Sequence, residues 1–295
     1  MGHHYSDDTL KLLLVLPLLF CFLVRSSNAV SSLRSDFVVS WSPNNVRFLG
    51  SHGDALQLVL DQNTGAGFMS KDRFLFGNID MQIKLIPGDS AGTVTAYYLS
   101  SQGNKHDELD FEFLGNSSGE PYVVQTNVFS AGVGGREQRI NLWFDPTKDF
   151  HSYSVRWSAK RVVFLIDGVP IRVFSNNEAV GVPYLRSQPM QVYSSIWNGD
   201  SWATRGGLVK IDWSQAPFIA TYRNFRFTNG CRASTPAAVS NCLHSSSANK
   251  LDAASWDPGF DKNKLSWVKR SFMIYDYCTD VARYPTAPAE CSREF

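Results

Sequence analysis

The sequence predicts an all-β fold, a two-layer sandwich of the jelly-roll kind. Between about residue 36 and residue 227, short runs rich in β-formers alternate with turn residues at regular spacing. Helical periodicity is almost absent from this region. Asp167-Gly168, between two such runs, is a strong signal for a β-hairpin. Many short strands with regular turn signals are typical of sandwiches and barrels.

The first 29 residues are expected to be a secretory signal peptide. Residues 12–24 form an apolar run that follows Lys11 and is interrupted only by Pro17, and Ser27-Asn28-Ala29 offers small residues for cleavage. The run is too short to span a bilayer comfortably, and no comparable run follows it. We therefore expect a secreted, soluble protein, in which residues 30–228 form the β-jelly-roll and residues 229–295 form an extension packed on it.

The expected strands are short and follow one another without long gaps. Turns are expected at Gly65-Ala66-Gly67 and at Pro87-Gly88. The runs that predict strands are residues 55–60, 74–85 (a strand pair or one bent strand), 93–99, 106–115, 122–129, 138–144, 151–157, 161–166, 169–174, 190–197, 208–213 and 218–227.

The run 106–115 carries an unusual row of acids. Leu109, Phe111 and Phe113 fall on one face of the predicted strand, while His106 and three carboxylates fall on the other. Neighbouring carboxylates on that face are ~7 Å apart, so each ionised pair repels by about 2 kcal/mol at an effective dielectric near ~20. Stability does not require such a row, so catalysis, a metal or a solvated acidic edge must explain it.

Catalysis is the favoured explanation. A calcium site usually takes its oxygen ligands from loops, and an acidic edge strand usually mixes Lys and Thr with its acids. Retaining glycosidases need two carboxyl groups ~5–5.5 Å apart, and inverting ones keep them ~6.5–9.5 Å apart. Strand spacing alone favours Glu108 with Asp110, or Asp110 with Glu112; Glu108 with Glu112 requires the two side chains to lean together. The spacing therefore leaves the roles open.

Composition limits the partners. A formal charge of +1 gives no reason to expect nucleic acid or an anionic membrane surface. The 8 Trp, 11 Tyr and 20 Phe suit a sandwich core, and some of them suit a cleft in which rings stack on sugars. The sequon at Asn116 in a secreted chain predicts N-glycosylation near one end of the acidic strand.

The tail differs in character from the sandwich. Four cysteines remain after removal of the signal peptide, and their short spacings favour the disulfides Cys231–Cys242 and Cys278–Cys291, although sequence alone leaves the other two pairings open. A zinc site is disfavoured because no C-x-x-C pair is present. Residues 233–249 resemble a loop, and Asp261 can cap a helix from about residue 262 whose apolar face is Leu265, Val268, Phe272 and Met273.

The acidic strand and its flanks resemble plant xyloglucan endotransglucosylase/hydrolases, retaining enzymes of glycoside hydrolase family sixteen with a concanavalin-like β-jelly-roll. The resemblance covers the chain from about Asp36 to its end. It rests on the blocks His-Asp-Glu-Leu-Asp-Phe-Glu-Phe-Leu-Gly (106–115), Asn-Ser-Ser-Gly-Glu-Pro-Tyr (116–122), Gln-Thr-Asn-Val-Phe (125–129), Arg-Glu-Gln-Arg (136–139), Leu-Trp-Phe-Asp-Pro-Thr (142–147), Trp-Asn-Gly-Asp-Ser-Trp-Ala-Thr-Arg-Gly-Gly (197–207) and Tyr-Asp-Tyr-Cys-Thr-Asp (275–280), with the final Cys291.

The resemblance implies a role for each carboxylate. Glu108 is implied as the nucleophile, Glu112 as the general acid/base, and Asp110 as the residue between them that orients and tunes Glu108. Glucan contacts are implied, in order, at Gln125, Thr126, Asn127, Gly135, Arg136, Glu137, Ser201, Trp202, Gly206 and Arg283. Many relatives have His at position 125 and an acid or Asn at position 201, so donor and acceptor preference stays open.

The implied function is cleavage of the β-1,4-glucan backbone of xyloglucan and transfer of the new end to another xyloglucan chain or oligosaccharide. The expected protein is a monomer of the cell wall or apoplast, with no cofactor, no metal and no nucleic-acid or membrane partner. Two alternatives are a predominantly hydrolytic xyloglucanase or related β-glucanase, and a carbohydrate-binding sandwich without activity. The latter would not need Glu108, Asp110 and Glu112 together.

Overall fold

The computed structural model describes residues 1–2, 32–244 and 258–293. The expected signal peptide therefore lies almost entirely outside the described residues. Within the described ranges, no helix has the length and apolar character needed to cross a membrane.

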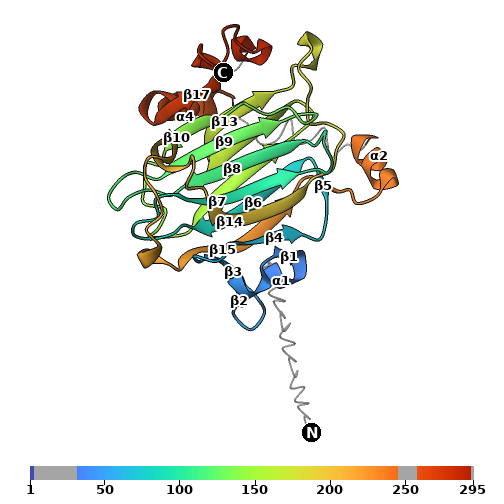
Figure 1. The fold of residues 1–295 in the computed structure, drawn as a ribbon. Helices are drawn as coiled ribbons and strands as arrows, with labels where there is room; N and C mark the ends of the chain where they lie inside the picture. Colours follow the sequence, from blue (N-terminus) through green and yellow to red (C-terminus); the bar gives the residue numbers. More distant parts are fainter. Residues whose placement is uncertain (3–31, 245–257, 294–295) are drawn as a thin grey trace.

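Two antiparallel sheets lie face to face (Figure 1). The first has eight strands in the order β1 (Phe37–Trp41), β4 (Ala66–Ser70), β14 (Gln191–Asn198), β7 (Thr93–Ser100), β8 (Glu108–Leu114), β9 (Val123–Phe129), β10 (Gln138–Asn141) and β17 (Met273–Asp276). The second has seven strands in the order β13 (Val169–Ser175), β12 (Arg161–Ile166), β11 (His151–Trp157), β6 (Gly77–Lys84), β15 (Phe218–Thr228), β3 (Ala55–Leu60) and β2 (Val46–Leu49). A small third sheet pairs β5 (Phe74–Leu75) with β16 (Cys231–Arg232).

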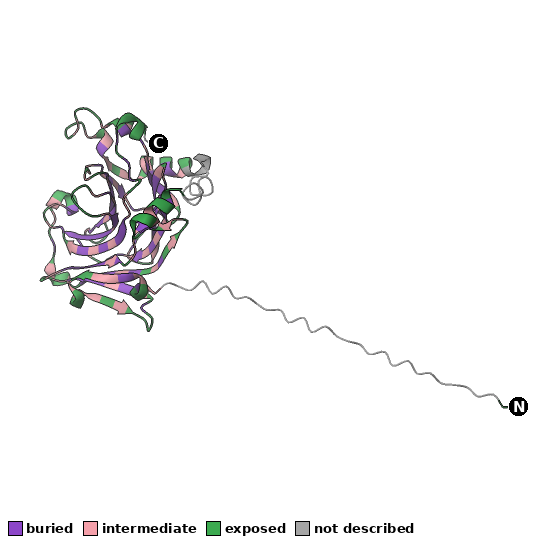
Figure 2. Ribbon diagram, turned by 90° about the vertical axis from the view of Figure 1, so that its right-hand side faces the viewer, coloured by how far each residue is buried: buried purple, intermediate pink, exposed green. Residues whose placement is uncertain are grey.

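The core lies between the two large sheets, and strand alternation fills it. On β8, Leu109, Phe111 and Phe113 are at most 1% exposed. Phe111 makes edge contacts with Phe164 of β12 (5.2 Å) and with Tyr153 of β11 (5.9 Å), so aromatic rings join the acidic strand to the opposite sheet. Figure 2 shows buried residues along the strands and exposed ones on the outlying helices and loops. Burial of one face of β8 leaves the other face for the three carboxylates.

Most of the predicted strands are confirmed. Strands β3, β11 and β12 have the expected bounds, and the hairpin between β12 and β13 turns at Asp167 (φ 49°) and Gly168 (φ 74°). The run 74–85 is a strand pair, β5 and β6. The all-β jelly-roll prediction is therefore correct in class and in most of its elements.

Four local predictions are wrong. Residues 208–213 are not a strand, because the chain there follows a tight turn through Arg205 and Gly206, which both have positive φ, and continues as a loop. Ala66 and Gly67 belong to β4 rather than to a turn, since both pair with β14. The tail helix α4 (Pro258–Ser271) begins at Pro258, before Asp261, and ends before two residues of its predicted apolar face, since Phe272 lies in a turn and Met273 in β17. Residues 236–244 lie in the stretch predicted to be a loop but form helix α2 (Pro236–His244). In addition, strands β1 and β2 were not predicted.

The C-terminal extension is partly built into the sandwich. Leu265 of α4 packs with Val163, Leu165 and Val173 on the outer face of the seven-stranded sheet. Strand β17 pairs with β10 and becomes the last strand of the other sheet. The extension therefore contacts both sheets.

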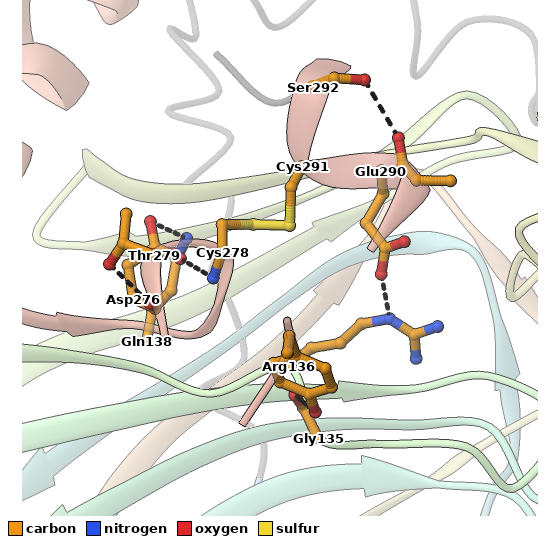
Figure 3. The surroundings of a disulfide bond; sticks show 11 residues. Gly135, Arg136, Gln138, Asp276, Cys278, Thr279, Glu290, Cys291 and Ser292 are labelled. Carbon is orange, nitrogen blue, oxygen red and sulfur yellow. Dashed lines mark hydrogen bonds and ion pairs between the residues drawn. A yellow bond between two sulfur atoms is a disulfide. The ribbon is translucent and has the colours of Figure 1, made fainter. Parts of the chain in front are cut away.

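Both predicted disulfides are present. Cys231–Cys242 joins β16 to α2 (Pro236–His244), and Cys278–Cys291 joins two short 3-10 turns, Tyr277–Thr279 and Ala289–Arg293. Figure 3 shows the second disulfide beside a buried ion pair of Arg136 with Glu290.

Candidate active site

An open cleft of about 530 Å³ lies on the outer face of the eight-stranded sheet, with the carboxylates of β8 on its floor. Its lining comes from β14, β7, β8, β9, β10 and β17 and from neighbouring loops. The lining residues are Ala96, Tyr98, Glu108, Asp110, Glu112, Gln125, Asn127, Phe129, Glu137, Arg139, Ser195, Trp197, Trp202, Tyr275 and Arg283.

Strand register sets which side chain lies beside each carboxylate. Glu112 pairs with Gln125 of β9, Gln125 with Arg139 of β10, and Arg139 with Tyr275 of β17. Because directly opposed residues share a face, these four side chains form one row across the sheet.

Hydrogen bonds run along this row to Glu112. Gln125 Nε2 donates to Glu112 Oε2 (2.5 Å), and Arg139 Nε donates to Gln125 Oε1 (2.7 Å). Burial raises the pKa of Glu112, and the charges of Glu108 and Glu137 raise it further. The hydrogen bond from Gln125 and the charge of Arg139 act in the opposite direction. The net rise in pKa favours a carboxyl group that holds a proton.

Asp110 is the most buried of the three carboxylates, at 7% exposed. Burial raises its pKa well above the ordinary value, and so do the charges of Glu108 and Glu112 and a hydrogen bond with Glu108. Across β7 and β14, Tyr98 stacks on Tyr193 with ring centroids 5.1 Å apart. Asp110 is thus a protonatable group in contact with Glu108.

His106 lies at the Glu108 end of the row of acids. Its Nε2 is 3.8 Å from Glu108 Oε2, and its Nδ1 lies 3.2 Å from the carbonyl of Gly103. The ring stacks on Phe129 at 5.3 Å. The imidazole is therefore held in place by an aromatic ring while it faces Glu108.

Polar and aromatic groups on the cleft walls have the chemistry of a sugar site. Asn127 Oδ1 accepts from the backbone N–H of Val128 (2.9 Å) and of Arg136 (3.0 Å), which leaves its Nδ2 donor for a ligand. Glu137 accepts from Arg283 Nη1 at 2.6 Å. Trp202 and Trp197 lie 6.0 Å apart between ring centroids and both face the cleft.

The structure brings five of the ten expected glucan contacts to the cleft: Gln125, Asn127, Glu137, Trp202 and Arg283. Two residues expected to contact glucan have buried side chains that do not line the cleft. Thr126 points into the core, is 0% exposed, and its hydroxyl accepts from Arg172. The guanidinium of Arg136 is turned away from the cleft and pairs with Glu290 at 2.6 Å (Figure 3).

The remaining three expected contacts lie outside the cleft lining. Gly135 is adjacent to the cleft wall, where its carbonyl accepts from Tyr284 (2.7 Å). Ser201 and Gly206 belong to the exposed loop that presents Trp202. Their backbone conformation, in particular φ +68° at Gly206, shapes this loop.

Sequence reasoning missed seven residues of the cleft lining: Ala96, Tyr98, Phe129, Arg139, Ser195, Trp197 and Tyr275. Arg139 could have been found, because it is two residues from the expected contact Glu137 and strand alternation puts residues i and i+2 on one face. Tyr275 could not, since it depends on the pairing of β17 with a strand far away in the chain.

Among residues 32–244 and 258–293, no group of three or more His, Cys, Asp or Glu side chains is arranged to hold a metal ion. Of the three carboxylates of β8, Glu112 accepts a hydrogen bond from Gln125, which in turn accepts one from Arg139. A hydrogen-bonded acid beside a second carboxylate, in a cleft lined by tryptophans, is suited to glycosyl chemistry.

Comparison with known proteins agrees with this geometry. The model of glycosyl hydrolases family 16 matches residues 33–215, and that of the xyloglucan endo-transglycosylase C-terminus matches residues 248–291. The chain is 52% identical over 268 residues to xyloglucan endotransglucosylase/hydrolase 2 of Glycine max, covering 90% of this chain and 91% of the relative. It is 49% identical over 294 residues to xyloglucan endotransglucosylase protein 2 of Diospyros kaki, covering 100% and 98%.

Solved structures share the fold. The Bacillus licheniformis beta-glucanase superposes with a TM-score of 0.51 at 24% identity, over 65% of this chain and 86% of that one. The laminarinase from Flavobacterium sp. UMI-01 superposes with a TM-score of 0.54 at 16% identity, over 68% and 96%. The sandwich fold is thus shared with these structures over 65% and 68% of this chain.

Proposed function

The chain belongs to the xyloglucan endotransglucosylase/hydrolases of glycosyl hydrolase family 16, and on that premise we propose that it cuts the β-1,4-glucan backbone of xyloglucan and joins the new end to another xyloglucan chain. The observation that carries the proposal is the outward face of β8, where Glu108, Asp110 and Glu112 lie side by side on the floor of the cleft. A carbohydrate-binding sandwich without activity would have no use for three mutually repelling acids.

The reaction has two steps, and in both of them Glu108 is the nucleophile or leaving group while Glu112 is the general acid or base. In the first, Glu108 attacks the anomeric carbon while Glu112 gives its proton to the leaving glycosidic oxygen, which forms a covalent glycosyl-enzyme. In the second, Glu112 takes a proton from the 4-hydroxyl of the acceptor, whose oxygen displaces Glu108. The raised pKa of Glu112 supports its role as the acid.

Asp110 assists Glu108 by sharing a hydrogen bond with it. When the glycosyl ester forms, Glu108 loses its negative charge and the bond weakens; when the ester breaks, the bond is restored. This exchange stabilises the carboxylate as it leaves and keeps the side chain oriented between the two steps.

Sugar binding is assigned to groups that remain accessible in the cleft. Trp202 and Trp197 offer ring faces, while Asn127 and the Glu137–Arg283 pair offer hydrogen bonds to hydroxyl groups. The cleft is open along the sheet, which suits a polymeric donor and a second chain as acceptor. Transfer prevails over hydrolysis if the bound acceptor excludes productive water.

The same proposal includes secretion to the cell wall and glycosylation of Asn116. Asn116 is half-buried in a second hollow formed with Trp143, and its Nδ2 donates to the carbonyl of Pro121 (2.9 Å). A glycan on this nitrogen leaves one N–H for that bond. Removal of N-glycans from the protein secreted by a plant host tests the assignment by a mass decrease that an Asn116→Gln variant does not show.

The proposed activity is tested with xyloglucan and a labelled xyloglucan oligosaccharide. We expect label to enter the polymer while reducing ends stay nearly constant. Accumulation of reducing ends without labelled polymer would instead assign a hydrolase. Binding without either product would assign a carbohydrate-binding protein.

A further inference from the structure

Strand β13 of the seven-stranded sheet places an arginine between the two sheets. Arg172 is 0% exposed. Its guanidinium lies over the ring of Phe164 (5.9 Å) and over the ring of Tyr277 (5.7 Å). Aromatic faces attract a cation, but they do not replace a carboxylate as its partner.

The guanidinium is only partly satisfied by hydrogen bonds. Its Nη1 donates to the carbonyl (3.1 Å) and to the hydroxyl (3.2 Å) of Thr126. Its Nε and Nη2 are buried without a hydrogen-bond partner in the part of the chain that the structure describes. Among the residues that the structure describes, the other buried arginine is Arg136, which pairs with Glu290 at 2.6 Å. Arg172 is therefore a buried cation whose positive charge must be balanced by negative charges farther away.

The acidic strand β8 is the neighbour of the strand that Arg172 contacts, because β9 carries Thr126 and pairs with β8. Thr126 of β9 is directly opposite Phe111 of β8, and Phe111 contacts Phe164 beneath the guanidinium. Asp110 and Glu112, the chain neighbours of Phe111, point to the opposite face of the same sheet. The cation and the carboxylates are thus separated by one layer of sheet, in a protein interior that screens charge weakly. Consistent with this placement, Arg172 opposes the burial-driven rise in the pKa of Asp110.

We propose that Arg172 is a positioning residue for the reaction proposed above, which acts from the core side of the sheet as the countercharge that stabilises the ionised carboxylates of β8. The effect of Arg172 on the reaction rests on the proposed function. The charge interaction between Arg172 and the carboxylates of β8 does not. Charge on the strand and charge on Arg172 stabilise each other, because each is costly to bury alone.

Other charged and titratable groups also face these carboxylates, and each is unchanged when Arg172 is replaced. On the cleft side they are His106, Tyr98 of β7, Tyr193 of β14, Glu137 and Arg139 at β10, Tyr275 of β17 and Arg283. On the core side they are Tyr97 of β7, Tyr153 of β11 and Tyr277, whose neutral rings carry no charge at neutral pH. The buried ion pair of Arg136 with Glu290, in which Arg136 also donates to the carbonyl of Val128 in β9, is unchanged as well. Replacing Arg172 therefore removes one charge and leaves all these groups in place.

The test replaces Arg172 with Met, which keeps the bulk and removes the charge, and with Lys, which keeps the charge. The pH profile of label transfer is measured for each. With Arg172→Met we expect the acidic limb to move to higher pH by about half a unit or more, since neutral carboxyl groups become easier to form. With Arg172→Lys it should stay near the parent position. Arg226→Met removes a solvent-exposed arginine from β15 and is the matched control, with no shift expected.

A direct titration separates this inference from the proposed function. Side-chain carboxyls labelled with ¹³C are titrated by NMR without substrate and assigned with Glu108→Gln and Asp110→Asn variants. A higher midpoint for the β8 carboxyls in Arg172→Met supports the inference even if the protein is inactive on xyloglucan. Unchanged midpoints overturn it, even if the parent protein transfers label.

Arg172→Met could fail to fold for lack of the Thr126 bonds. The same substitution is then made in a Glu108→Gln/Asp110→Asn background, where the strand has lost the charges that need compensation. Recovery of folded protein in that background supports the countercharge. Equal failure in both backgrounds shows that Arg172 acts only through packing and its bonds to Thr126, and overturns the proposal.

Discussion

At the level of single residues, Gln125 lowers the proton affinity of Glu112. It donates to Glu112 and accepts from Arg139, so it passes the influence of a cation on β10 to the proposed acid on β8. The hydrogen bond from Gln125 lowers the pKa of Glu112, against the larger effect of burial. A group that must give a proton and take it back works best when its pKa lies near the working pH.

Replacing Gln125 with Met should therefore raise the pKa of Glu112. The basic limb of the transfer profile, which reports loss of that proton, should move to higher pH, and kcat/KM at the parent optimum should fall by about 10-fold as the acid becomes a poorer donor. The profile is measured in the labelled-oligosaccharide assay. Gln57→Met on β3 of the other sheet is the control. A basic limb that moves to lower pH would contradict the role of Gln125.

Asp110 is expected to assist catalysis but to make the fold less stable as pH rises. Because its pKa is raised in the folded protein, chiefly by burial, the folded state binds its proton more tightly than the unfolded chain does. Its contribution to stability is then present at low pH and is lost as pH rises through the raised pKa.

Asp110→Asn should accordingly gain stability relative to the parent as pH rises, while losing transfer activity. The measurement is the difference in Tm between variant and parent from about pH 4 to about pH 8. We expect this difference to increase with pH. A difference that is constant or decreases over this range would show that Asp110 is ionised in the fold without penalty.

At the level of elements, strand β17 makes the C-terminal extension part of the cleft. It pairs with β10 and presents Tyr275 beside Arg139. The chain that follows it brings Arg283 to Glu137, with Nη1 to Oε2 at 2.6 Å and Nη2 to Oε1 at 3.4 Å. The extension thereby builds one wall of the proposed sugar site.

Arg283→Met should weaken substrate binding more than it slows chemistry. We expect KM for xyloglucan to rise by about 10-fold, the usual effect of losing one hydrogen bond to a charged group, with a smaller change in kcat. Glu137→Gln should have a similar effect, and the double variant should cost less than the sum of the two. An unchanged KM in the single variants, or a double variant whose effect equals the sum of the two, would contradict a joint role of Arg283 and Glu137 in binding. Arg226→Met is again the control for loss of a positive charge.

Elements with clear alternation were predictable from sequence, and those that depend on distant pairing were not. Residues 151–157 and 161–166 are bounded by turn chemistry and were predicted to the residue. Residues 208–213 have the composition of a strand but do not pair with any described strand. Met273 has the spacing of a helix residue, yet pairing with β10 places it in β17.

The site shows the same division. Strand alternation was enough to place Glu108, Asp110 and Glu112 on one face. It would also have placed Thr126 in the core, because Gln125 and Asn127 flank it on the cleft face. Arg136 was beyond such reasoning, since its partner Glu290 lies in the extension. Tertiary contacts decide the direction of long side chains, and no local pattern contains them.

At the level of the whole molecule, two disulfides stabilise different parts of the chain. Cys278–Cys291 closes a segment with a sequence separation of 13 that carries Arg283 and Glu290. Cys231–Cys242, with a separation of 11, holds α2 against β16, and neither of these elements lines the cleft. The two bridges therefore form a matched pair for testing whether the extension serves the site.

Replacing both Cys278 and Cys291 with Ser should lower the free energy of unfolding by about 3 kcal/mol and the Tm by roughly 6–12 °C. It should also raise KM, because the wall with Arg283 loosens. Replacing both Cys231 and Cys242 with Ser should cost similar stability with KM unchanged. The measurements are thermal denaturation and transfer kinetics well below the Tm. Equal KM changes in both variants would show that the extension has no specific part in binding.

The central claim is that Glu108 and Glu112 divide a two-step reaction between them, and mass spectrometry of the enzyme during turnover tests it most directly. Protein mixed with xyloglucan is quenched in acid, treated to trim the glucan, and digested. We predict a glycosyl adduct on the peptide that contains Glu108, absent from Glu108→Gln. An adduct on a residue other than Glu108 would contradict this division of roles. So would the absence of any adduct from a sample that transfers label.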